Sequence, residues 1–168
     1  MEPFAQFERD FLHANTWSQR KDGVPLYLLD QLSPEERVRA EDSLIESLSE
    51  GDSWPAEGLG HLRSTKALPA LYALLARSKQ GMVISVACSI YQINKDPKMV
   101  EALLTELPRI TSEYALIDIL YDLRIFDDPR IKTALKKYRS DHRYLVAYNA
   151  ARALGESTDE VVREFRKK

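Results

Sequence analysis

Helix starts recur at a nearly constant spacing in this chain, and this recurrence restricts its fold more than any other sequence feature. Asp96-Pro97 and Asp128-Pro129 lie 32 residues apart, and each places a capping aspartate before a proline, a typical helix start. Around these starts, apolar residues follow the three- and four-residue spacing of helices, and no useful length alternates with the period of a strand. The sequence therefore predicts an all-α chain of short helices.

The boundaries of the predicted helices follow from the same signals. Phe4, Phe7, Phe11 and Ala14 form an apolar stripe at helical spacing. A capping box at Ser33 to Glu36 starts the next long helix, which stops near Gly51. Further helices are expected at about 55–63, 66–78, 82–94, 97–107, 113–125, 129–140, 143–155 and 158–167. Helices of this length that recur about every 30 residues are typical of stacked hairpins, because one hairpin cannot bury its apolar face alone.

Two segments connect this pattern to a known family. Residues 59–71 (LGHLRSTKALPAL) and 146–155 (VAYNAARALG) resemble the junction and the second helix of HEAT-like repeats of the phycobilisome-lyase type, in a compact bacterial form. The resemblance covers about residues 33–168. It implies a single domain, a right-handed α-solenoid of stacked antiparallel hairpins with about 9–10 helices. Residues 1–32 would form an N-terminal capping segment, and residues 33–168 about four hairpin repeats.

Composition is typical of a soluble globular protein. The 168 residues are 44% hydrophobic and 30% charged, a balance that disfavours disorder. Cys88 is the single cysteine, which excludes an intramolecular disulfide. The first residues lack the pattern of a signal peptide, and the longest apolar runs are about half of the ~20 residues that span a bilayer. We therefore expect a cytoplasmic protein that does not enter the membrane.

The charges divide unevenly along the chain. Residues 1–128 carry 13 Lys and Arg against 21 Asp and Glu, a net charge of −8, whereas residues 129–168 carry 11 against 5, a net charge of +6. This asymmetry indicates two surfaces of different potential, although a basic terminal helix that is merely solvated explains it as well.

The sequence contains no recognisable catalytic or metal-binding motif. The histidines His13, His61 and His142 are scattered, and Asp10 with His13 supplies only two possible metal ligands. Gly58 and Gly60 form a Gly-x-Gly without the strand and third glycine of a phosphate loop. Cys88 lies among apolar residues of a predicted buried helix, as an inert core thiol would. We expect no enzyme activity, no metal and no cofactor.

The candidate partner-binding residues lie on successive second helices of the predicted hairpins. Asp118 and Asp122 share one helix face at i and i+4, with tyrosines beside them. Tyrosine combines a large apolar area with a polar tip, which suits an interface anchor. Solvated carboxylates and tyrosines packed between layers are the alternative interpretation. The predicted partner-binding set is Tyr91, Tyr114, Asp118, Tyr121, Asp122, Tyr144, Tyr148 and Arg152.

A basic segment near the C-terminus offers a second, weaker candidate surface. Lysines one turn apart on a helix can follow a phosphate backbone. The sequence pI near 6.0 and the lack of aromatic residues between the lysines argue against a nucleic-acid footprint. The alternative nucleic-acid set is Lys132, Lys136, Lys137 and Arg139.

These observations favour a non-enzymatic module that binds a partner protein through its second-helix face. The resemblance suggests an immunity protein that neutralises a bacterial toxin, so the expected partner is a toxin or enzyme with a basic surface. We expect a monomer or a heterodimer with that partner. A nucleic-acid-binding protein and an accessory subunit like a bilin lyase remain open as alternatives.

Overall fold

A computed structural model of the chain describes residues 2–167. This range contains helices and no strands, as expected of an all-α protein. Twelve α-helices occur there, two more than the upper end of the expected number. The difference arises before residue 33, where the chain forms two extra helices of one turn each, α2 (Trp17–Arg20) and α3 (Tyr27–Asp30). No helix in the described range is long and apolar enough to cross a membrane.

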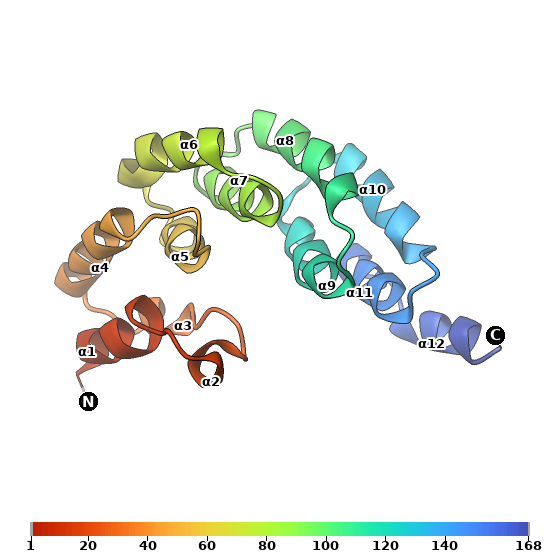
Figure 1. Cartoon of the computed structure of the whole chain (residues 1–168), viewed down its shortest axis with the longest axis horizontal. Helices are drawn as coiled ribbons and strands as arrows, with labels where there is room; N and C mark the ends of the chain where they lie inside the picture. Colours follow the sequence, from red (N-terminus) through yellow and green to blue (C-terminus); the bar gives the residue numbers. More distant parts are fainter. Residues whose placement is uncertain (1, 168) are drawn as a thin grey trace. The chain divides into compact units, whose positions relative to one another are not determined.

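The helices belong to two compact units, which are coloured by sequence in Figure 1. The first unit comprises residues 2–78 and 89–95, and the second comprises residues 79–88 and 96–167. The helices of the first unit are α1 (Pro3–Phe7), a π-helix η1 (Glu8–Leu12), α2, α3, α4 (Pro34–Glu46), α5 (Trp54–His61), the 3₁₀ turn η2 (Thr65–Ala67), α6 (Leu68–Arg77) and the end of α7 (Gly81–Asn94).

A row of contacting aromatic rings forms the core of the N-terminal part of the first unit. Phe4, Phe7 and Phe11 are buried, as their spacing predicted, and their rings lie 5.7 and 5.4 Å apart in succession. Phe11 then meets Trp54 of α5 edge-on, with ring centroids 5.8 Å apart. The helix continues through this stripe as a π-helix. These contacts fasten the N-terminal segment to the first long hairpin, α4 and α5.

The predicted start of α4 is confirmed. The Ser33 side chain accepts a hydrogen bond from the Glu36 amide, and the Glu36 carboxylate accepts one from the Ser33 amide at 2.8 Å. This capping box satisfies two amides that would otherwise lack partners at the helix start.

Gly58 and Gly60 permit close helix packing. A Cβ atom on Gly60 would lie 2.5 Å from the Gln92 side chain and 2.9 Å from the Ser89 backbone, both in the last turns of α7. A Cβ on Gly58 would lie 2.9 Å from Phe11. The Gly-x-Gly pattern is therefore explained by packing inside the first unit.

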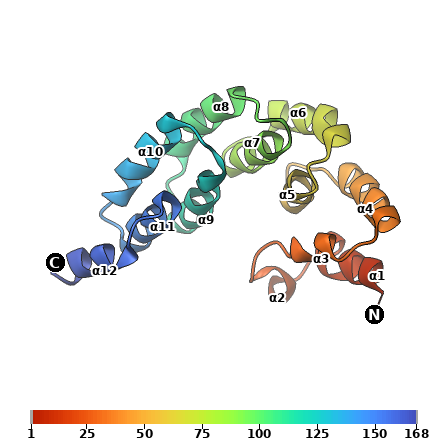
Figure 2. The same ribbon diagram turned by 180° about the vertical axis from the view of Figure 1, so that it is seen from behind.

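The second unit is a set of hairpins in two layers. Its elements are the start of α7, α8 (Lys98–Glu106), η3 (Leu107–Arg109), α9 (Glu113–Asp122), η4 (Leu123–Ile125), α10 (Pro129–Arg139), α11 (Tyr144–Leu154) and α12 (Thr158–Arg166). Helices α8 and α10 form one layer and α9 and α11 the other, as both views show (Figures 1 and 2). The Asp128 carboxylate accepts a hydrogen bond from the Arg130 amide, which confirms the predicted start of α10.

Small residues bring α11 close to its neighbours. Ala147 and Ala151 are fully buried and form an apolar cluster with Val161 of α12. Gly155 ends α11 with a φ of 72°, the left-handed conformation that glycine adopts without steric cost. The predicted pattern of residues 146–155 is therefore a packing pattern inside the second unit.

Candidate partner-binding surface

The solvent side of α9 and α11 carries two rows of side chains at corresponding helix positions. Tyr114, Asp118 and Asp122 follow one another at four-residue steps on α9, so they lie on one helix face. Thirty residues later, the equivalent positions on α11 are Tyr144, Tyr148 and Arg152. The two helices pack side by side, and the opposite face of α9 supplies buried Leu116, Ile119 and Leu120. These six residues of the predicted partner-binding set thus lie on two helices that pack side by side.

The two carboxylates of the α9 row lack a cationic partner. No Lys, Arg or His nitrogen lies within ion-pair distance of Asp118 or Asp122 among residues 2–167. Both side chains reach water, yet the surrounding protein limits their hydration. Desolvation raises the pKa of Asp118. Desolvation and then repulsion from Asp118 raise the pKa of Asp122 to about 6, and Arg124 opposes the change from a longer distance.

The tyrosines of this surface differ in their exposure. Tyr114 is 81% exposed and Tyr144 is 38% exposed. Tyr148 is half-buried against the Ala147 cluster, and the Tyr144 ring contacts both Tyr148 and Phe165 of α12. Tyr114 is thus the free aromatic side chain of the surface, whereas Tyr144 and Tyr148 are part of the aromatic packing at the end of the unit.

Tyr121 is covered by two arginines. The guanidinium carbon of Arg124 lies 3.9 Å from the centre of the Tyr121 ring, and that of Arg152 lies 4.7 Å from it. Arg124 also donates a hydrogen bond to the Tyr121 hydroxyl. Sequence reasoning missed Arg124, although its position three residues after Tyr121, one helical turn away, would have signalled the contact.

Tyr91 lies in the first unit, at the end of α7, and the Lys95 ammonium lies 4.7 Å from its ring centre. It therefore does not belong to the surface that α9 and α11 form within the second unit.

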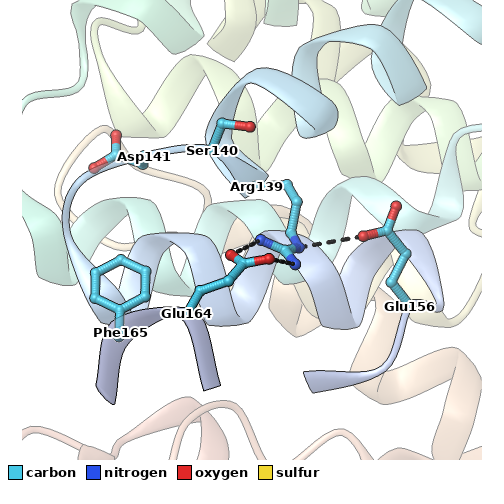
Figure 3. A pocket seen from close by; sticks show the side chains of 6 residues that line it. All are labelled: Arg139, Ser140, Asp141, Glu156, Glu164 and Phe165. Atoms are coloured by element: carbon cyan, nitrogen blue, oxygen red, sulfur yellow. Dashed lines mark hydrogen bonds and ion pairs between the residues drawn. The ribbon is translucent and has the colours of Figure 1, made fainter. Parts of the chain in front are cut away.

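The basic residues of α10 fall into two groups. Lys136 and Lys137 are exposed without an ion pair in the described range, and Lys132 pairs with Asp127 at 3.1 Å. Arg139 is different, because its side chain is only 14% exposed. It donates to both carboxylate oxygens of Glu164 at 3.0 and 3.1 Å, and its Nε lies 3.3 Å from Glu156 (Figure 3). Arg139 therefore holds the C-terminal helix and does not extend the exposed lysine pair.

The histidines and remaining candidates have structural neighbours. His61 Nε2 lies 2.8 Å from an Asp30 carboxylate oxygen, and Asp10 pairs with the adjacent Arg9. Cys88 is buried, as expected. No group of three or more metal-binding side chains occurs among residues 2–167.

The chain matches no protein-family model, and neither the curated proteins nor the solved structures give a significant match.

Proposed function

We propose that this chain is a non-enzymatic protein-interaction module that binds a cationic segment of a partner protein through the α9–α11 surface. The single observation that carries the proposal is the carboxylate pair of Asp118 and Asp122. These carboxylates lie one helical turn apart, without an ion pair to any of residues 2–167, in an environment that raises the pKa of both. A lysine or arginine from a partner would relieve their repulsion and replace the lost hydration.

Tyr114 supplies the apolar part of the proposed interface. It is almost fully exposed and stands one turn before Asp118 on the same face. Large aromatic side chains at the edge of a charged pair are typical interface anchors, because they bury much area at a low cost in conformational entropy.

The proposed arrangement of the hairpins is a right-handed HEAT-like α-solenoid across residues 33–168. Its support is the recurrence of hairpins at about 30 residues and the two-layer order of α8 to α11. Small-angle scattering tests it: an elongated particle is expected, and a spherical one would contradict it.

Neutralisation of a toxin is the specific role that the HEAT-like resemblance suggests, and it predicts a tight heterodimer with a basic toxin domain.

The test is charge reversal at the carboxylate pair. A partner captured by affinity purification from the native cell is purified, and its binding is measured by calorimetry. Asp118→Lys combined with Asp122→Lys should abolish binding, while helicity and melting temperature stay nearly unchanged because both side chains reach water. Unchanged binding would overturn the proposal.

A matched control makes the same change of charge elsewhere in the unit. Asp159→Lys combined with Glu160→Lys alters two exposed carboxylates at the start of α12. This variant should bind the partner as the unmodified protein does. Equal loss in both variants would mean that net charge, rather than the α9 pair, determines binding.

The nucleic-acid alternative has weaker support, since Arg139 is held by carboxylates and Lys132 is paired. A mobility shift at low salt that fades at high salt would favour it. A change in bilin absorbance on mixing would favour the bilin-lyase-like alternative.

A further inference from the structure

Two arginines lie beside the carboxylate pair, one of them on the α9–α11 surface itself, and the binding of a cationic segment gives neither of them a role. Arg124 follows α9 in η4, and Arg152 belongs to α11, yet both guanidinium groups converge on the Tyr121 ring, at 3.9 and 4.7 Å from its centre. Both side chains are exposed, and neither forms an ion pair with any of residues 2–167.

This lack of ion pairing distinguishes the two arginines from four of the six others in the same unit. Arg109, Arg130, Arg139 and Arg143 each bind a carboxylate, at 2.6 to 3.0 Å for their shortest ion pairs. Asp118 and Asp122 lie on the same surface, but the guanidinium groups stack on Tyr121 instead of reaching them. Two like charges near one ring repel each other, so an anion within reach of both would be attracted by both.

The donor set fits a tetrahedral oxyanion. Each guanidinium presents a planar fork of N–H donors, which binds phosphate oxygens in pairs. The Tyr121 hydroxyl, which already accepts from Arg124, has its own proton to donate to a further oxygen.

A cavity lined mainly by apolar side chains, but with two cationic ones, adjoins Arg124 of this donor set. It has a volume of about 90 Å³, and Arg124 forms part of its wall. Leu123, Leu135 and Leu154 line it, together with Lys132, whose charge is paired with Asp127. Such a cavity can bind a phosphate ester. The small apolar group of the ester would enter the cavity, and its charged phosphate group would stay at the rim beside the cations.

We propose that Arg124, Arg152 and the Tyr121 hydroxyl form a binding site for a phosphate monoester with a small apolar group, which occupies the neighbouring cavity. The oxyanion accepts hydrogen bonds from both guanidinium groups at the edge of the Tyr121 ring. This site is separate from the carboxylate pair, and it takes a ligand of opposite charge.

The test uses butyl phosphate and inorganic phosphate as probes at pH near 7.5, with the side-chain Nε–Hε signals of the arginines followed by NMR. Saturable shifts are expected for Arg124 and Arg152. Butyl phosphate should bind about ten-fold more tightly than inorganic phosphate, because its butyl group leaves water. Shifts that do not saturate would overturn the oxyanion site. Equal affinity for the two probes would overturn the binding of the apolar group in the cavity.

Variants locate the binding. Arg124→Gln combined with Arg152→Gln should weaken butyl phosphate binding by about ten-fold or more, the loss expected for charge-assisted hydrogen bonds. Arg152→Lys should give an intermediate value, since it keeps the charge and loses the fork. The control, Arg163→Gln combined with Arg166→Gln on α12, removes two exposed arginines and should leave binding unchanged; an equal loss would show diffuse charge attraction. Circular dichroism verifies that each variant is folded.

The result is independent of the proposed function. Asp118→Lys combined with Asp122→Lys should abolish partner binding but strengthen butyl phosphate binding, because it removes two nearby anions. If this variant lost phosphate binding, the assignment of the oxyanion site to the arginines would be wrong, whatever happened to the partner.

Discussion

Arg139 donates hydrogen bonds to both carboxylate oxygens of Glu164, at 3.0 and 3.1 Å, and so ties α10 to α12 (Figure 3). The contact closes one side of an open cavity of about 440 Å³ that Phe165 also lines. Val161 is the only residue of α12 that is buried in the described structure. The ion pair is therefore a principal attachment of this helix.

Replacing Arg139 with leucine should loosen α12. The expected loss of unfolding free energy is about 1 kcal/mol, because Glu164 is half exposed and water screens part of the attraction. Amide hydrogen exchange should accelerate in α12 more than in α9. Arg163→Leu, an exposed position on the same helix, is the control. Unchanged exchange in α12 would mean that Val161 and Phe165 suffice to hold it.

Replacing Asp122 with asparagine should stabilise the protein at neutral pH. The pKa of Asp122 in the folded state, about 6, lies above the ordinary 3.8, so the folded state binds the proton more tightly than the unfolded state. The charged form therefore costs stability above pH 6, and the cost disappears as pH falls toward 4. We expect a gain of up to about 1 kcal/mol after allowing for solvent screening.

Urea unfolding of both proteins between pH 7.5 and 4 measures this effect. The gain of Asp122→Asn should be nearly constant from pH 7.5 to about 6 and should shrink as the pH falls from 6 to 4. Glu160→Gln, which removes an exposed carboxylate from α12, serves as the comparison. A gain that does not vary with pH would contradict the raised pKa.

Replacing Asp141 with asparagine should destabilise the protein at neutral pH, the opposite of the effect expected for Asp122→Asn. Hydrogen bonds from the Arg143 guanidinium, at 2.9 Å, and from the Arg143 amide lower the pKa of Asp141 to about 2. This contribution is present above pH 4 and is lost as pH falls through 2. The variant should lose about 1 kcal/mol at pH 7, a value reduced for partial solvent screening. The difference from the unmodified protein should shrink as the pH falls from 4 to 2 and approach zero below pH 2, whereas Asp127→Asn, at an exposed ion pair, should show little effect at any pH.

Replacing Gly60 with alanine should destabilise the first unit. The new methyl group would lie 2.9 Å from the Ser89 backbone, which cannot move without shifting α7. The expected cost is about 2 kcal/mol, measured by urea unfolding. Gly81→Ala is the control, since no atom lies within 4 Å of its added Cβ. Similar effects at both positions would point to backbone entropy rather than to the close approach.

Local signals in the sequence were sufficient for the longer helices. The capping box at Ser33 and the Asp128 cap act within three residues, and the stripe of Phe4, Phe7 and Phe11 depends on helical period alone. The two short helices before residue 33 were missed. Their single turns carry no apolar periodicity, and contacts with distant residues hold α2, such as the bidentate ion pair between Arg20 and Asp52. The capping box of Thr16 and Gln19 is a local signal for the start of α2 that sequence reasoning missed.

The sequence by itself determined the all-α class, the main helix starts, and the row of Tyr114, Asp118 and Asp122 on one helix face, because these follow from periodicity along a single helix. Only the tertiary structure decided which charges are free. Arg139 and Lys136 look equivalent in sequence, but Arg139 meets Glu164, 25 residues away, and Lys136 meets no carboxylate in the described range. Likewise, the raised pKa of Asp122 and the stacking of Arg152 on Tyr121 arise where α9 and α11 pack together. Charge state and pairing depend on neighbours brought together by folding, and helical periodicity carries no information about them.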